Sequence, residues 1–484
     1  MRIYVVLRYV ALALLLNALF MGISALIAVL YSDGALLPLL YSTLVTALFG
    51  LFPLIFTPPV YDITNKEGLL IVTTSWLVTC LFGTLPYILW GEPFSVTNAW
   101  FESVSGFTTT GSSILENVEL LPKSLMFWRA ATHWIGGIGI IIFVMAVLPF
   151  LGIAEMILFR TELSALARDS FHSRARKGIQ IIAGVYVGLT LLETIALIIA
   201  GMDLFDAVTH SFATIATGGF STRNASIAYY HSTAIETVII LFMLLSGINF
   251  ILLFFAVTGK IKDVLKTPVL HYYLLSILIG VLITTFNLHQ SADAAWNTAL
   301  RNAVFNVVSV ATSTGFASAD TAVWPVTSQL LLMFFALQCA CSGSTSGGIK
   351  TDRIVLLAKA FLQQLTKLRH PNAVVAVRIG KQSIGDDVVH ANVIYIIIYL
   401  AVVFAAAVAA SMAGVNMKAA VSGAIACMGN VGPGLGSVGS MANFAHIPDL
   451  AKLIYSAVML LGRLEIYAFF ILFTPAQWRD TITY

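Results

Sequence analysis

Four short segments of the sequence combine threonine, serine and glycine in a way that could bind a cation through main-chain oxygens. They are Thr108-Thr109-Thr110-Gly111-Ser112, Ala216-Thr217-Gly218-Gly219-Phe220, Thr312-Ser313-Thr314-Gly315-Phe316 and Gly429-Asn430-Val431-Gly432-Pro433. Glycine accepts positive φ and keeps side chains out of a narrow passage, and carbonyl oxygens can replace the hydration shell of an ion. None of the segments contains an acidic residue, which argues against a carboxylate site for a divalent ion. They are therefore predicted to line a passage for a monovalent cation.

The four segments agree in register beyond the glycines used to align them. An alanine stands twelve residues before each of these glycines, at Ala99, Ala207, Ala303 and Ala420. Seven residues before each glycine the residue is apolar, at Val104, Phe212, Val308 and Ile425. Three segments carry a residue type that favours helix N-caps thirteen residues before the glycine, at Asn98, Asp206 and Asn302. Ordinary polar turns are the alternative interpretation, but a common register favours a common role.

Elements that could hold such segments must lie in a membrane. Of the 484 residues, 59% are hydrophobic and 10% are charged, against about 25% charged in an average soluble domain. Apolar runs of about 20 residues recur, the length that spans a bilayer core, and they lack the alternation of barrel strands. A helix of about ten residues rises about 15 Å, half of that core. Such a helix could enter from outside and return as a loop that lines a water-filled pore.

The apolar runs predict an all-α polytopic membrane protein with ten transmembrane helices. The predicted spans are 7–31, 36–57, 69–90, 125–151, 179–201, 232–257, 269–287, 325–369, 389–413 and 453–474. The eighth is too long for one crossing and should be broken at Gly343-Ser344-Thr345-Ser346-Gly347-Gly348. Two extra helices in 1–67 precede four pseudo-repeats of helix, re-entrant pore loop and helix around one pore. The predicted repeats are 68–151, 152–257, 258–380 and 381–484.

Basic residues predict the orientation of these spans, because cytoplasmic loops are enriched in Lys and Arg. With both termini in the cytoplasm, most of the 26 Lys and Arg fall on the inner side. The outer side then holds Lys123, Arg129, Arg223, Arg301, Lys418 and Lys452, and Arg463 lies inside the last span. The net charge of +3 therefore reflects membrane orientation and does not indicate nucleic-acid binding, and the surrounding membrane lipid is the expected contact.

These segments also resemble a known family. The loops FTTTGSS, ATGGFST, TSTGFAS and GNVGPGLG, with CSGSTSGGIK and LLGRLEIYAFF, resemble the TrkH/TrkG-type membrane subunits of the Trk/Ktr/HKT superfamily of potassium transporters. The resemblance implies a bacterial inner-membrane protein, a homodimer in many members, that takes up potassium through a gated, channel-like filter. Sodium- or proton-coupled symport is the alternative. It also implies a separate cytosolic RCK-type nucleotide-binding regulatory subunit, TrkA-like, and no covalent cofactor, with K⁺ as the transported ligand.

The resemblance assigns roles to particular residues. The implied potassium-binding filter comprises Thr109, Thr110, Gly111, Thr217, Gly218, Gly219, Ser313, Thr314, Gly315, Asn430, Val431 and Gly432. Gly111 favours potassium, because sodium-preferring plant members carry serine at this place. The implied gate comprises Gly343, Ser344, Thr345, Ser346, Gly347, Gly348 and Arg463. The alternatives are a packing kink at the glycine-rich segment and, for Arg463, a structural ion pair remote from the pore.

The remaining polar residues indicate no enzyme. The sequence has no HExxH or GxSxG motif, and Ile349 separates Gly348 from Lys350, which excludes a Walker A motif. His133, His210 and Glu193 are interpreted as structural residues, and Gly136-Gly137-Ile138-Gly139 as a site of close helix packing. Glu102 and Asp206 could concentrate cations near an outer mouth, or Asp206 could simply cap a helix. The four cysteines, Cys80, Cys339, Cys341 and Cys427, are interpreted as small buried hydrophobic residues.

Overall fold

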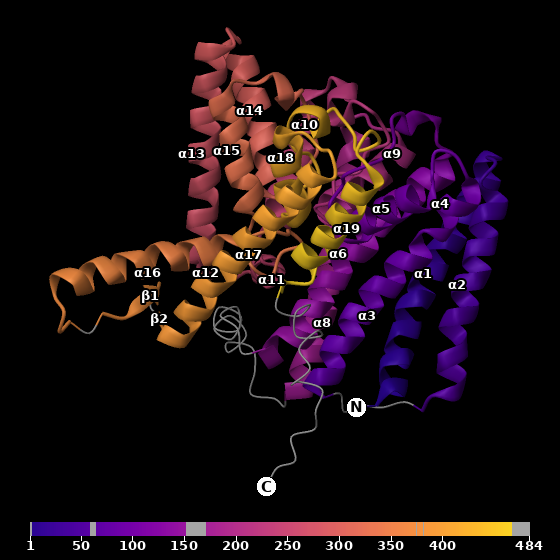
Figure 1. Cartoon of the computed structure of the whole chain (residues 1–484), viewed down its shortest axis with the longest axis horizontal. Helices are drawn as coiled ribbons and strands as arrows, with labels where there is room; N and C mark the ends of the chain where they lie inside the picture. The colour runs from indigo at the N-terminus through magenta and orange to yellow at the C-terminus, as the bar shows by residue number, and fades with distance from the viewer. Residues whose placement is uncertain (1, 59–63, 152–170, 374, 381, 467–484) are drawn as a thin grey trace.

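The computed structural model describes residues 2–58, 64–151, 171–373, 375–380 and 382–466, and nearly all of its regular elements are helices (Figure 1). Within these ranges the only sheet is a hairpin of β1 (Val377–Ile379) and β2 (Gln382–Ile384), in which Arg378 pairs with Ser383. The predicted all-α class is therefore correct for the described part of the chain.

Six helices of the described ranges are long and apolar enough to cross a bilayer. They are α1 (Ile3–Tyr31), α2 (Leu36–Phe56), α3 with α4 (Asn65–Gly83 and Leu85–Trp90), α8 (Phe171–Ile199), α13 (Pro268–Ser291) and α17 (Asp386–Met412). They coincide with the first, second, third, fifth, seventh and ninth predicted spans, and α6 (Lys123–Leu151) occupies the fourth. These helices therefore account for seven of the ten predicted spans.

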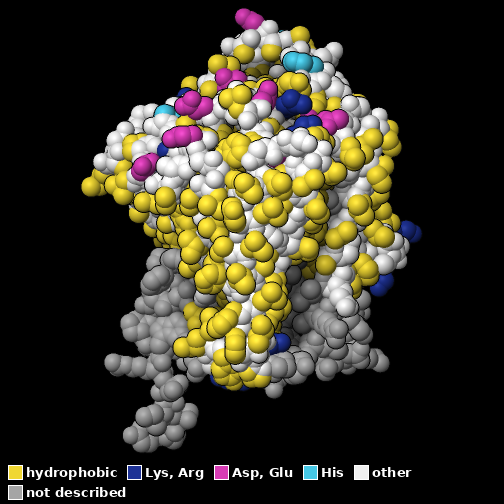
Figure 2. All heavy atoms as spheres, turned by 90° about the vertical axis from the view of Figure 1, so that its right-hand side faces the viewer, with side chains coloured by type: hydrophobic (Ala, Val, Ile, Leu, Met, Phe, Trp, Pro, Cys, Tyr) yellow, Lys and Arg dark blue, Asp and Glu magenta, His cyan; other side chains and the backbone are white. Residues whose placement is uncertain are grey.

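The surface formed by the first helices is apolar over most of its height. Figure 2 shows the side that carries α1 and α2, with a broad band of hydrophobic side chains below a zone where acidic and basic side chains gather. On α2 the exposed residues include Leu44, Leu48 and Phe52. An apolar band of this extent is typical of a surface in contact with lipid.

The sixth predicted span is not one continuous helix, which corrects the sequence prediction. It consists of α10 (Thr233–Ser246) and α11 (Phe250–Val257), which meet at an angle of 107°. Asn249 caps α11 by accepting a hydrogen bond from Ile251 N–H at 2.8 Å, and Phe250 N–H donates to Gly343 O at 3.1 Å. The chain bends here because the new helix start is capped and the bend receives the glycine-rich segment.

The eighth span is broken, as predicted, into α15 (Val326–Leu337) and α16 (Thr351–Arg369). Figure 1 shows α16 running sideways from the body, across the direction of α13, towards the hairpin. The short α12 (Ile261–Val264) follows α11 in the chain and packs against it. The tenth span differs in extent, because α19 (Asp449–Arg463) stops at Arg463 and Glu465 has a left-handed backbone with φ of 54°. Residues 467–474 of that span lie outside the described residues.

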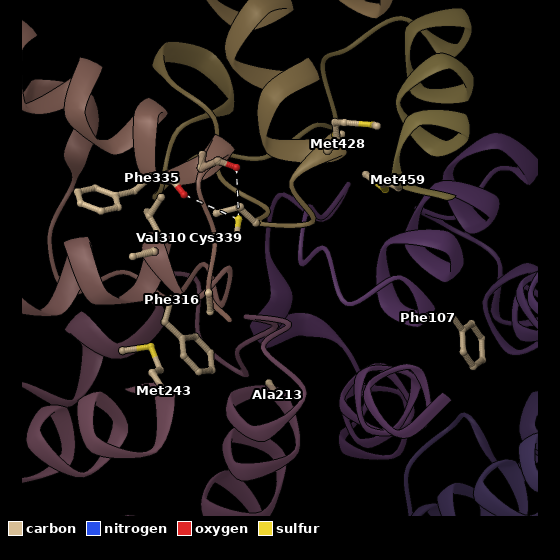
Figure 3. Close-up of a cluster of buried hydrophobic side chains, with 14 of the residues drawn as sticks. Phe107, Ala213, Met243, Val310, Phe316, Phe335, Cys339, Met428 and Met459 are labelled. Atoms are coloured by element: carbon tan, nitrogen blue, oxygen red, sulfur yellow. Dashed lines mark hydrogen bonds between the residues drawn. The ribbon is translucent and has the colours of Figure 1, made fainter. Parts of the chain in front are cut away.

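Four short helices precede the four glycine segments, as predicted. They are α5 (Val96–Phe107), α9 (Leu204–Ile215), α14 (Trp296–Ala311) and α18 (Met417–Met428). Twelve residues in α5, α9 and α18 rise about 18 Å, too little to cross a bilayer. Figure 3 shows one residue of each in the same buried core, namely Phe107, Ala213, Val310 and Met428.

The predicted caps lie inside these helices, Asn98 and Asp206 by one turn and Asn302 by two turns. The observed N-caps of α5, α9 and α18 are Ser95, Asp203 and Asn416, each accepting a hydrogen bond from the N–H three residues later. Asn98 and Asp206 are the donors of two of these bonds, and Asn302 lies within α14. The shared register was correct, but polar residues one or two turns inside the helices resembled caps.

Candidate functional site

The four short helices end in the same hydrogen-bonded turn. In each, the residue two before the loop glycine has a left-handed backbone, as in a Schellman motif. These residues are Thr109, Thr217, Ser313 and Asn430, with φ of 51°, 55°, 55° and 52°. In the first loop Thr110 N–H donates to Ser105 O at 2.9 Å. The same bond joins Gly218 to Ala213, Thr314 to Ser309 and Val431 to Ala426. The positions that are equivalent in the four sequence segments therefore also share the same backbone conformation and hydrogen bond.

The four loop glycines bring the loops together in a closed ring. Gly111, Gly219, Gly315 and Gly432 have φ of 82°, 80°, 82° and 98°. On each of them the place of a Cβ is occupied by a carbonyl oxygen of another loop. In the same order, these oxygens belong to Gly218, Thr314, Val431 and Thr110. Each loop thus meets the next and the fourth meets the first, so a side chain at any of these glycines would collide with a neighbouring backbone.

The carbonyl groups of this ring have no hydrogen-bond donors of their own. No hydrogen bond within the described ranges ends on the carbonyl oxygens of Thr110, Gly218, Thr314 or Val431, although these residues are buried. A buried carbonyl without a donor is costly unless water or an ion satisfies it. The carboxyl ends of four short helices, each with a partial negative charge, converge on the same place. The arrangement can therefore coordinate a cation through main-chain oxygens.

A funnel opens on one side of the ring. It offers about 110 Å³ to water-sized molecules, enough for several, and all four ring glycines line it. Glu116, Arg129 and Arg223 also border it. A hydrated ion could therefore approach the ring from this side.

The return limb of each of the first three loops is held to its own short helix by the residue nine before the glycine. Glu102 accepts hydrogen bonds from the Ser113 hydroxyl at 2.9 Å and from Ile114 N–H at 2.9 Å. His210 Nε2 contacts the Ser221 hydroxyl at 2.9 Å, and Asn306 donates to the Ser318 hydroxyl at 3.0 Å. In the fourth loop the Ser422 hydroxyl accepts from Leu435 N–H at 2.9 Å. These bonds fix the loops against the helices that present them.

The two acidic residues predicted near an outer mouth are buried and paired. Glu102 forms an ion pair with Arg129 at 2.8 Å, and both side chains are at most 3% exposed. Asp206 accepts from the Tyr230 hydroxyl at 2.6 Å and pairs with Arg223 at 3.2 Å. Neither carboxylate is free to attract cations, and Asp206 is not the N-cap of α9. Both hold the loop structure together.

The segment predicted as a gate lies directly against the ring. Ser344, Thr345, Ser346, Gly347 and Gly348 are buried, and Gly343 is partly exposed. Gly347 N–H donates to the Ser313 hydroxyl at 3.0 Å, and the Ser346 hydroxyl accepts from the same hydroxyl at 2.9 Å. A Cβ on Gly347 would collide with Gly429 O. The segment therefore touches the third and fourth loops on the side of their left-handed residues.

Arg463 joins this segment to the first repeat. Its guanidinium donates to Thr345 O at 2.6 Å and to Gly136 O at 3.1 Å, and the residue is 2% exposed. None of the ion pairs between described residues includes Arg463, whereas Glu465 pairs with Arg353 at 2.6 Å. The remote ion pair proposed as an alternative is therefore not its environment. A buried positive charge bound to carbonyls remains beside the ring.

The other predicted residues are placed as follows. His133 and Glu193 are fully buried, and their side-chain polar atoms have no hydrogen-bond partner among the described residues. The four cysteines are buried free thiols, and no group of His, Cys, Asp and Glu in the described ranges could hold a metal ion. Gly136 and Gly137 allow close packing, because side chains there would collide with Phe107 O and with the Tyr186 hydroxyl.

Sequence reasoning missed two residues that complete the site. Lys350 donates from Nζ to Ser346 O and so supports the glycine-rich segment, and Asn249 donates to Ser342 O at 3.0 Å from the bend between α10 and α11. Lys350 could have been found because it ends the CSGSTSGGIK motif. Asn249 gave only the weak signal of a polar residue inside an apolar run.

The chain is similar to proteins of one family along nearly its whole length. Residues 44–479 match the sequence profile of the TrkH family, described as cation transport proteins. The chain is 37% identical to Trk system potassium uptake protein TrkH of Halomonas elongata, covering 99% of this chain and 100% of that protein. It is 36% identical to TrkH of Escherichia coli strain K12, covering 98% of this chain and 99% of that protein.

A solved structure agrees with the fold. The crystal structure of the potassium transporter TrkH from Vibrio parahaemolyticus superimposes with a TM-score of 0.90 at 34% identity, covering 99% of this chain and 100% of that one. With its apolar helices, the protein is thus a multi-pass membrane protein of a transporter family and not an enzyme. Family profile, relatives and structure agree that this chain belongs to the TrkH family of cation transport proteins.

Proposed function

We propose that this protein takes up potassium across the bacterial inner membrane through a pore whose selectivity filter is the ring of four glycine loops. The closed ring carries the proposal, because its four buried carbonyl oxygens accept no hydrogen bond from the described residues. Potassium is the ion named for the relatives in Halomonas and Escherichia. The absence of any carboxylate from the four loops favours a monovalent ion over a divalent one.

The proposed filter uses three consecutive residues of each loop. It comprises Thr109, Thr110, Gly111, Thr217, Gly218, Gly219, Ser313, Thr314, Gly315, Asn430, Val431 and Gly432. The Schellman turns hold the carbonyls by using the N–H groups of the same residues, so the oxygens stay directed away from the helices. The buried Thr109 hydroxyl has no partner among the described residues and could bind an ion or water on the inner side.

The glycine-rich segment and Arg463 form the gate of this pore. Residues 344–348 are buried against Ser313 and Asn430, so they occupy the place that an ion would reach after the filter. The guanidinium of Arg463 adds a positive charge that repels a cation there and holds Thr345 O at 2.6 Å. Conduction then requires this segment to move aside. Its only side chains are those of small serines and a threonine, which suits such a movement.

The arrangement in the membrane extends the proposal to the whole chain. The helices 1–67 precede four repeats, 68–151, 152–257, 258–380 and 381–484, which surround one pore with ten spans. Both termini lie in the cytoplasm, and the funnel opens outside. The outward placement is supported by the loops that border the funnel, which contain few of the basic residues.

In this orientation the cytoplasmic side carries a surface that could bind a soluble partner protein. The arm of α16 and the hairpin projects from the body (Figure 1) and carries Lys359, Lys367, Arg369 and Arg378. A basic arm that continues from the gate segment suits a soluble regulatory subunit, which we propose to be the RCK-type, nucleotide-binding partner. We further propose a homodimer in contact with membrane lipid.

Ion flux into liposomes that contain the purified protein tests this function. Rubidium, which resembles potassium in size, should enter when an interior-negative potential is imposed, without sodium and without a pH gradient. A potential of 100 mV supplies about 2.3 kcal/mol per charge, which is sufficient to drive uptake. Flux that requires sodium or a proton gradient would support coupled symport instead. Absence of any cation flux in folded protein would overturn the proposal.

A further inference from the structure

In three of the four filter loops, hydrogen bonds of the loop's own side chains form a brace that restrains the backbone. In the first, the Thr108 and Thr110 hydroxyls lie 2.7 Å apart, and in the third the Thr312 and Thr314 hydroxyls lie 2.8 Å apart. These pairs connect the residues three and one before the loop glycine. In the fourth loop the Asn430 amide donates to Met459 O and to the Thr110 hydroxyl, both at 3.0 Å. In the first and third loops the brace holds Thr110 and Thr314, whose carbonyls belong to the ring. In the fourth loop it holds Asn430, which directly precedes Val431 and its ring carbonyl.

The second loop cannot form either brace. It has Ala216 and Gly218 at the two positions that carry threonines in the first and third loops, and Thr217 where the fourth has Asn430. The Thr217 hydroxyl bonds only to the adjacent Ala216 O, at 2.6 Å. Gly218 is also the one glycine among the four residues that supply ring carbonyls. Its backbone is therefore the least restrained of the four by the loop itself.

The imidazole of His133 fills the place of the missing side chain. A Cβ on Gly218 would collide with Nδ1 of this ring and would lie 2.5 Å from Cγ. His133 comes from α6, is fully buried, and stacks on Phe220 with ring centroids 4.1 Å apart and planes 15° apart. Phe220 directly follows the ring glycine of the second loop. The histidine thus contacts the loop on both sides of that glycine.

Close to His133, α6 is also bonded to both the first and the second repeat. One helical turn earlier on α6, the Arg129 guanidinium lies 4.0 Å from the centre of the Phe220 ring. Arg129 is also paired with Glu102 on α5 at 2.8 Å and donates to Ser221 O at 3.4 Å. Because Arg129 is bonded to both repeats and the imidazole is fully buried between Gly218 and Phe220, the imidazole has little room to move away from Gly218.

In the fourth repeat the position equivalent to His133 is occupied by a methionine. Gly136 and Gly462 are equivalent, because side chains there would collide with Phe107 O and Met428 O, each four residues before a ring glycine. Three residues before these glycines stand His133 and Met459. Met459 meets a loop that has its own brace, and it contributes its carbonyl to that brace. His133 meets the loop that has none.

We propose that His133 is a positioning residue that sets the place of the Gly218 carbonyl and thereby the ion selectivity of the filter. It acts by volume, since its ring nitrogens have no partner among the described residues. This inference rests on the proposed filter function. The inference goes beyond that function because it assigns part of the selectivity to a residue of α6 that lies outside the four loops.

A double-mutant cycle on the potassium-to-sodium permeability ratio tests this inference. His133→Ala leaves a space behind the second loop, and Gly218→Ala places a Cβ against the imidazole, so each should lower the ratio by about tenfold. In the double variant the new Cβ enters the vacated space, so the ratio should recover in part. His133→Phe, which keeps a ring of similar shape, should retain most of the wild-type ratio.

Controls separate this inference from the filter proposal and from damage to the fold. Gly184→Ala, in a helix with no atom near the new Cβ, should leave the ratio unchanged. If Gly315→Ser lowers the ratio but His133→Ala and Gly218→Ala do not, the inference is wrong and the filter proposal stands. If the effects of the two single changes simply add, or if His133→Phe loses as much as His133→Ala, the space-filling role is wrong. If Gly315→Ser also leaves the ratio unchanged, the filter proposal itself fails.

Discussion

At the scale of residues, the site depends on backbone conformations that residue type only partly reveals. The ring glycines could be named from the sequence, because glycine is the residue that tolerates positive φ and close approach of a backbone. The left-handed residues before them could not, because Thr109, Thr217 and Ser313 are types that avoid this region. Such a residue carries strain of about 1–3 kcal/mol. The two N–H bonds of each Schellman turn offset that strain, and they become visible only in the folded helix ends.

The ion pair of Glu102 and Arg129 gives a prediction at this scale. Arg129→Met would leave the Glu102 carboxylate buried without its partner, which typically destabilises a protein by about 3–5 kcal/mol. The Tm of the purified variant should therefore fall by several degrees. Adding Glu102→Gln removes the buried charge and should recover part of the loss. Equal Tm values for wild type and Arg129→Met would show that the pair does not hold the first loop.

At the scale of elements, apolar runs identified the spans but not their interruptions. The glycine-rich break of the eighth span was predicted, because six consecutive small residues cannot form a stable apolar helix. The bend after α10 was not, since only Ser246, Gly247 and Asn249 interrupt the apolar run there, and the effect of Asn249 depends on a contact with a segment about a hundred residues away. The helix end at Arg463 was missed for the same reason, because its carbonyl partners come from the glycine-rich segment and from α6.

The proposed gate gives the prediction at the scale of elements. Arg463→Ala, or deletion of residues 344–346, should raise ion flux, since either change removes groups that are buried against the inner side of the ring. Lowering the barrier by about 1.4 kcal/mol would raise flux about tenfold. Selectivity should not change, because the ring itself is intact. Arg301→Ala, which breaks the pair with Glu236 elsewhere in the chain, serves as a matched control. Unchanged or lower flux in both folded gate variants would reject this assignment.

At the scale of the whole molecule, the fourfold pattern of the sequence becomes a closed ring of contacts. The common register of the sequence predicted that the four loops follow equivalent short helices. The structure adds the order of the loops around the ring, because each loop glycine contacts a carbonyl of the next loop. Orientation rests on the distribution of charge, and part of the basic segment 160–177 lies outside the described residues. The side of the membrane that each loop faces can be measured directly.

Accessibility of single cysteines gives that experiment. The four native cysteines are buried, so an introduced one should dominate labelling by an impermeant reagent. Lys262→Cys should react from the cytoplasmic side and Leu120→Cys from outside, since both residues are exposed and lie on opposite sides in the proposed topology. Labelling of position 120 from the cytoplasm would contradict both the topology and the outward direction of the funnel.

The proposed regulatory partner gives a second prediction for the whole molecule. Adding a soluble RCK-type subunit with nucleotide should change ion flux, because the basic arm of α16 continues directly from the gate segment. Neutralising Lys367 and Arg369 at the end of that arm should weaken the effect without altering flux in the absence of the subunit. If the subunit and nucleotide leave wild-type flux unchanged, the regulatory proposal is wrong, while the pore proposal is unaffected.

The most direct test of the ring as a selectivity filter is the reversal potential in mixed potassium and sodium. The wild-type protein should prefer potassium, and serine at Gly111, Gly219, Gly315 or Gly432 should each reduce that preference, because each new side chain would collide with a carbonyl of the neighbouring loop. A displacement worth about 1.4 kcal/mol changes selectivity about tenfold. Gly184→Ser, at a position with open surroundings, should behave as wild type. Four serine variants that fold and keep the wild-type reversal potential would contradict the account.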